Sequence, residues 1–94
     1  MSDTDKKFYD RADAHIQLAN EQLADAPVNR VSASLLFSAA RFSAWMSASG
    51  FDSAANMQAE REAMLDFFTQ QYRAMLEENI DNYIEHFERY IPRK

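Results

Sequence analysis

The 94-residue sequence contains one glycine, two prolines and no cysteine. A β-rich protein of this length needs many turns, and turns draw on glycine, proline and Asn-Gly or Asp-Gly pairs. The scarcity of these residues therefore predicts few turns and long helices. It also excludes glycine-rich phosphate loops and dinucleotide-binding fingerprints. Without cysteine, the chain has no disulfide, no thiol catalysis and no cysteine-based zinc or iron–sulfur site.

The charge balance is acidic, with 15 Asp and Glu against 10 Lys and Arg and a formal net charge of −5. No basic cluster is present, so we expect neither nucleic acid nor an anionic membrane surface as a partner. The longest weakly charged stretch, Val31 to Ser49, is too rich in serine to span a membrane. The first seven residues are polar and lack the apolar run of a secretory signal. We therefore expect a cytoplasmic location.

The length and a hydrophobic content of 47% predict one all-α domain over residues 1–94, frayed at residues 1–4 and 92–94. The first of three predicted helices covers about residues 4–25. Thr4 or Asp5 is suited to accept N–H groups of its first turn, and Pro27 disfavours helical geometry in the residue before it. Five residues at spacings of three and four form its apolar face: Phe8, Ala12, Ile16, Ala19 and Leu23.

The second predicted helix covers about residues 28–49 and is apolar or small on nearly every side. A helix of this kind is usually buried on most sides, so we interpret it as the central element. Gly50 follows directly and suits the left-handed position beyond a helix end. One face carries Val28, Val31, Leu35, Ser38, Phe42, Trp45 and Ser49.

The third predicted helix covers about residues 53–91 and is much longer than the other two. Asp52 or Ser53 is a suitable N-cap, and the next glycine or proline is Pro92. About 38 residues give a helix of roughly 57 Å, whereas a compact domain of this size is roughly 30 Å across. Its apolar series is Leu65, Phe68, Tyr72, Leu76, Ile80, Tyr83, Phe87 and Ile91.

The distal half of this helix is too apolar to be left in water without forming an interface-like patch. Either the helix breaks near Asn79 or Asn82 and folds back, or the distal half packs on a second copy of the chain. Because no helix breaker supports the first possibility, we favour a homodimer that completes the helical-bundle packing. The candidate self-association surface consists of Met75, Leu76, Ile80, Tyr83, Ile84, Phe87 and Ile91.

No arrangement of residues predicts a metal, cofactor or catalytic site. A helical metal site needs further His or carboxylate ligands at spacings such as Glu-x-x-His, and neither His15 nor His86 has them. The acids Glu78, Asp81 and Glu85, with Glu88, share one helix face, which we interpret as solvated. We therefore expect a non-enzymatic protein that acts through contact with itself or with an unidentified protein partner.

Two alternatives remain. A small-molecule binder would place its pocket between the second and third helices, lined by Arg41, Phe42, Trp45, Phe68 and Tyr72, with Arg41 as the polar anchor. The more conservative interpretation of Arg41 is a structural ion pair with an acid such as Asp13 or Asp66. A helical acidic mimic of nucleic acid is the weaker alternative, because a net charge of −5 is modest for that role.

Several segments of the sequence resemble a known family. They are Phe8-Tyr9, Ala12-Asp13, residues 15–20, 30–33 and 40–42, and in the last helix residues 72–79 and 87–90. They resemble short bacterial helical proteins classed as a domain of unknown function. The resemblance spans most of the chain, so it implies one family domain and a small all-α protein. It implies no catalytic or binding residues.

Overall fold

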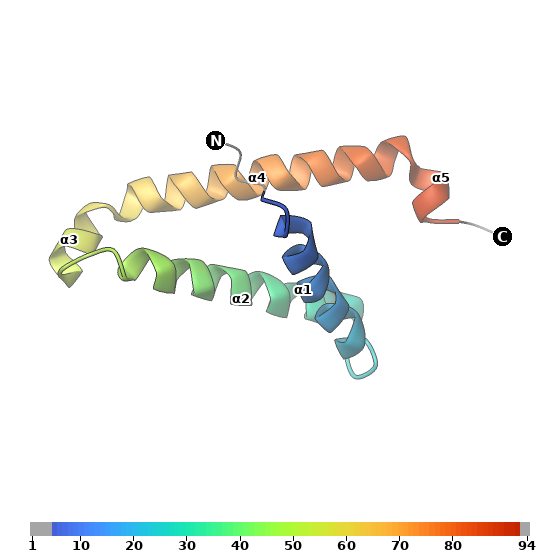
Figure 1. The fold of residues 1–94 in the computed structure, drawn as a ribbon, viewed down its shortest axis with the longest axis horizontal. Helices are drawn as coiled ribbons and strands as arrows, with labels where there is room; N and C mark the ends of the chain where they lie inside the picture. Colours follow the sequence, from blue (N-terminus) through green and yellow to red (C-terminus); the bar gives the residue numbers. More distant parts are fainter. Residues whose placement is uncertain (1–4, 93–94) are drawn as a thin grey trace. The chain divides into compact units, whose positions relative to one another are not determined.

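The computed structural model describes residues 5–92, and these form five helices and no strand, which confirms the all-α class. The fraying expected at residues 1–4 and at 93 and 94 lies outside the described residues. Figure 1 shows the order of the helices along the chain. The chain divides into two compact units, residues 1–50 and residues 51–94, each of which is described by itself.

In the first unit, α1 (Phe8–Gln22) is preceded by a turn built on Asp5. The Asp5 carboxylate accepts hydrogen bonds from the Lys7 N–H at 2.9 Å and from the Arg11 guanidinium at 3.1 Å. Arg11, followed by the Lys7 backbone, holds the pKa of this exposed carboxyl below its usual value. The helix thus begins at Phe8, later than the predicted start, and its N-cap is Lys7 without a side-chain cap, so Asp5 binds an N–H of the preceding turn and does not cap the helix. The other candidate, Thr4, lies outside the described residues.

The connection between α1 and α2 (Val28–Ala48) begins with a tightened helical turn. Leu23, Ala24 and Asp25 each donate a backbone hydrogen bond three residues back, at 3.2, 3.3 and 3.0 Å. Helix α1 thus ends three residues before the predicted end, and the turn continues to Asp25. Pro27 then adopts extended geometry (φ −69°, ψ 157°) as the N-cap of α2. Because proline has no backbone N–H to donate, it cannot continue the preceding helical turn, and it therefore sets this boundary.

Helices α1 and α2 contact each other. Among residues 5–92, Val31 on α2 is the one hydrophobic residue that is buried, at 6% exposure. Ala12 and Ala19 on α1 are partly buried. Their small side chains fit a close approach of two helices. Val28, one turn before Val31 on α2, is 69% exposed. The first unit is therefore a helical hairpin with a very small core.

The prediction for Gly50 was wrong. No glycine or other residue in the described part of the chain has a positive φ, so Gly50 does not adopt the left-handed conformation. The last turn of α2 is instead closed by bonds from Ser49 N–H to the Trp45 carbonyl and from Gly50 N–H to the Ser47 carbonyl, both 3.0 Å. Because these bonds form in right-handed geometry, the helix end does not require the conformational freedom of glycine.

The second unit corrects the prediction of a single helix over residues 53–91. The segment consists of α3 (Ala54–Ala59), α4 (Arg61–Glu85) and α5 (Phe87–Tyr90). The breaks lie at Glu60 (φ −101°, ψ 8°) and at His86 (φ −116°, ψ 34°). The Asn79–Asn82 region, where a break was considered, lies inside the uninterrupted α4. There the Asn79 amide donates to the Met75 carbonyl at 2.8 Å.

Neither break coincides with a glycine or proline, so each has to be explained by packing. Helices α3 and α4 contact each other across the bend at Glu60, and Met57 and Met64 on either side are both partly buried. Burial of apolar side chains on both sides of the bend is favourable and offsets part of the cost of the non-helical geometry at Glu60. The break at His86 is accompanied by contacts between aromatic rings, described below.

Ser53 is the N-cap of α3, as the sequence predicted, and its hydroxyl oxygen accepts a hydrogen bond from the Asn56 N–H at 3.1 Å. We expect Ser53→Ala to cost about 1 kcal/mol, the usual loss of a serine cap. The melting temperature should fall by about 4–8 °C in a domain of this size. Ser49→Ala is the matched control, because its hydroxyl donates to a carbonyl inside α2 and caps no N–H. Equal melting temperatures for both variants would contradict the capping role.

Candidate self-association surface

Five of the seven residues predicted for self-association lie on α4 and share its uninterrupted axis. All seven are exposed, from 41% for Leu76 and Ile91 to 68% for Ile84. The five on α4 are Met75, Leu76, Ile80, Tyr83 and Ile84. Because successive residues of a helix turn by about 100°, Leu76, Ile80 and Tyr83 lie on one side of α4, and Met75 and Ile84 lie at its two edges. The other two, Phe87 and Ile91, follow the break at His86 and therefore do not continue the α4 row.

The apolar row of α4 begins earlier than the predicted surface. Leu65 is 46% exposed and Tyr72 is 47% exposed, and both belong to the same helical series as Leu76 and Tyr83. The apolar series of the third predicted helix, which includes Leu65 and Tyr72, was expected to face the core of the domain. In the structure they are as exposed as the surface residues, whereas Phe68 between them is partly buried.

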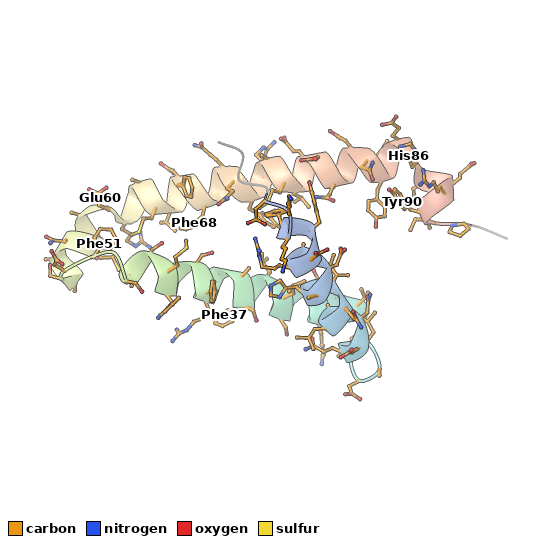
Figure 2. The ribbon with its side chains drawn as sticks, viewed as in Figure 1. Phe37, Phe51, Glu60, Phe68, His86 and Tyr90 are labelled. Atoms are coloured by element: carbon orange, nitrogen blue, oxygen red, sulfur yellow. The ribbon has the colours of Figure 1, made fainter. Side chains whose placement is uncertain are left out.

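Tyr83 is in contact with Tyr90 across the break between α4 and α5. The two ring centroids are 4.4 Å apart with an interplanar angle of 33°. The His86 ring meets the Tyr90 ring edge-on at 6.2 Å, and the Arg89 guanidinium lies 5.9 Å from the Tyr90 ring centroid. Figure 2 shows the His86 and Tyr90 side chains at this break. The sequence analysis missed this cluster, because the two tyrosines lie seven residues apart.

Glu78, Asp81 and Glu85 lie on the side of α4 away from Leu76, Ile80 and Tyr83. Arg73 Nε is 3.2 Å from Glu77 Oε2, and His86 Nε2 is 4.0 Å from Glu85 Oε2. Such exposed pairs contribute only a few tenths of a kcal/mol. An open hollow of about 450 Å³ adjoins this region and is lined by Ile84, Glu85, His86, Phe87, Glu88 and Arg89.

The residues predicted for a ligand pocket lie in both units. Arg41, Phe42 and Trp45 are exposed residues of α2, and the Phe42 and Trp45 ring centroids are 5.5 Å apart. Phe68, which is partly buried, and Tyr72 lie on α4 of the second unit. The structure thus brings Phe42 and Trp45 together, and the pocket as a whole stays a prediction.

The exposed apolar side chains of the first unit were also underestimated. Leu35, Leu36 and Phe37 on α2 are 40%, 51% and 67% exposed. Figure 2 shows Phe37 projecting from this helix. The sequence predicted that α2 is buried on most sides, and the hairpin alone does not bury it. Within residues 5–92, no helix has the length and hydropathy needed to cross a membrane.

Comparison with known families now identifies the chain. A family model described as "Protein of unknown function (DUF3144)" matches residues 8–84, which run from the start of α1 almost to the end of α4. The chain belongs to this family. This confirms the resemblance to a domain of unknown function, and it assigns no activity. A comparison with curated proteins gives no match.

One solved structure is similar over nearly the whole DUF3144 chain. It is described as the NMR structure of the protein NB7890A from Shewanella sp.. The two sequences are 36% identical, the similarity covers 95% of each chain, and the TM-score is 0.77. The small helical fold is therefore shared with this relative, whose description names no ligand or activity.

Proposed function

We propose that this DUF3144 protein is a non-enzymatic, cytoplasmic protein–protein interaction module that acts as a homodimer. The observation that supports the proposal is the distribution of apolar side chains. Val31 is the buried hydrophobic residue of the described chain, while 22 large hydrophobic side chains are exposed. Monomeric proteins rarely leave contiguous apolar rows of this kind in water.

The length of α4 favours a second copy as the occupant of its apolar row. The 25 residues of α4 give about 37 Å of helix, longer than the roughly 30 Å diameter of a compact domain of this size. A row along such a helix extends beyond what one small domain covers. A second α4 has the same length and the same row, as a self-complementary two-fold interface requires.

If unfolding and dissociation occur in one step, apparent stability rises with protein concentration. We expect the midpoint of thermal unfolding to rise by about 3–6 °C for each tenfold increase in protein concentration in a dimer of this size. Circular dichroism melting curves at protein concentrations from about 1 to about 100 µM, a hundred-fold range, measure this shift in the midpoint. A midpoint independent of concentration would contradict the homodimer.

A further inference from the structure

The contact between Tyr83 and Tyr90 exists only while the chain is bent at His86. In a straight α-helix, residues seven apart are separated by about 10.5 Å along the axis. The observed distance between the two ring centroids is 4.4 Å. The ring contact therefore distinguishes the bent form from a continuous helix over residues 61–91.

The bend depends on the backbone of a single residue. His86 has φ −116° and ψ 34°, whereas α-helical geometry lies near φ −63° and ψ −42°. Its N–H still donates to the Asn82 carbonyl at 3.1 Å, and its carbonyl accepts from Arg89 and Tyr90 at 3.0 and 3.1 Å. Helical hydrogen bonding thus resumes directly on both sides, and no glycine or proline fixes the bend.

The bend also changes which apolar residues can continue the α4 row. With His86 in helical geometry, Phe87 and Ile91 would follow Tyr83 at helical spacings of four and four. In the bent form, the Tyr90 ring covers part of Tyr83, and Phe87 and Ile91 belong to the separate helix α5. The bent and straight forms therefore present different lengths of the self-association surface.

We propose that α5 is a fold-back cap that regulates self-association, with the Tyr90 ring competing with a second copy of the chain for Tyr83. This inference rests on the proposed homodimer. Binding of a second copy along α4 displaces Tyr90 from Tyr83 and returns His86 to helical geometry. The row then extends through Phe87 and Ile91. A population of the bent form reduces apparent affinity, because only the straight form offers the full surface.

The test compares Tyr90→Ala with Tyr90→Phe, which keeps the ring and is the matched control. Loss of one aromatic pair corresponds to a factor of about 2–12 in an equilibrium constant. Sedimentation equilibrium should show the dimer dissociation constant of Tyr90→Ala lowered by about that factor, with Tyr90→Phe unchanged. Circular dichroism should show more helix in Tyr90→Ala than in the unmodified protein.

The outcomes separate the cap from the homodimer. An unmodified protein that dimerises, with Tyr90→Ala dimerising equally or more weakly, overturns the cap and leaves the homodimer standing. An unmodified protein that is monomeric at every concentration overturns the homodimer and the cap with it. If Tyr90→Ala does not fold, His86→Ala replaces it, since it removes the second ring contact and favours helix at the bend. An unchanged dissociation constant in His86→Ala would overturn the cap.

Discussion

A glutamate in place of Leu76 or Ile80 is expected to dissociate the proposed homodimer into monomers or to unfold the chain. Leu76 and Ile80 are 41% and 48% exposed in the single chain and lie centrally on the apolar row of α4. Burying such a side chain stabilises by about 1.5–3 kcal/mol, and in a two-fold dimer each substitution occurs twice. The dissociation constant should therefore rise by about two to four orders of magnitude, which corresponds to about 3–6 kcal/mol.

Ala74→Glu is the matched control for Leu76→Glu. It introduces the same charge two residues away, on the opposite side of α4, because successive residues turn by about 100°. We expect Ala74→Glu to remain dimeric and to change stability by no more than about 0.5 kcal/mol. Sedimentation equilibrium and far-ultraviolet circular dichroism on both variants give the comparison. A Leu76→Glu protein that stays a stable dimer would show that the surface is wrongly placed.

A second large loss of stability is expected from a charged residue at Val31, which tests whether the core of the first unit lies there. Val31 is 6% exposed on α2. Val31→Asp would place an unpaired charge in that position, and an uncompensated buried charge costs about 3–5 kcal/mol. We expect the melting temperature to fall by more than about 12 °C, or the fold to be lost.

Val28→Asp provides the comparison on the same helix. Val28 is 69% exposed and is the first residue of α2, where an acidic side chain is favourable near the positive end of the helix dipole. We expect its melting temperature to remain within about 4 °C of the unmodified protein, since surface substitutions usually change stability by less than about 0.5 kcal/mol. Equal losses at Val28 and Val31 would contradict the placement of the core at Val31.

Most of the fold follows from short-range sequence signals. Pro27 separates α1 from α2, Ser53 caps α3, and the lack of turn residues gives an all-α chain. The breaks at Glu60 and His86 could not be predicted from such signals, because no glycine or proline marks them. At His86 the bend is accompanied by the Tyr83–Tyr90 contact, and a pattern of helical spacing assumes a straight axis that excludes this contact.

The sequence predicted only part of the candidate surface, because helical spacing assumes a straight helix axis. Helical spacing placed Leu76, Ile80 and Tyr83 on one side of a helix, which holds because α4 is uninterrupted there. It also placed Phe87 and Ile91 on that side, and the bend moves them off the row. The burial of individual residues was harder to predict from the sequence than the positions of the helices. Val28 and Val31 belong to one predicted face, but spacing does not reveal how far the neighbouring helix reaches, and only Val31 is buried.

The most direct measurement of the homodimer is the mass of the unmodified protein in solution. The chain mass is 10.9 kDa. Sedimentation equilibrium at micromolar concentrations should give about 22 kDa, because the proposed homodimer holds two chains of this mass. A mass of 10.9 kDa at every concentration, together with a cooperative thermal transition, would contradict it.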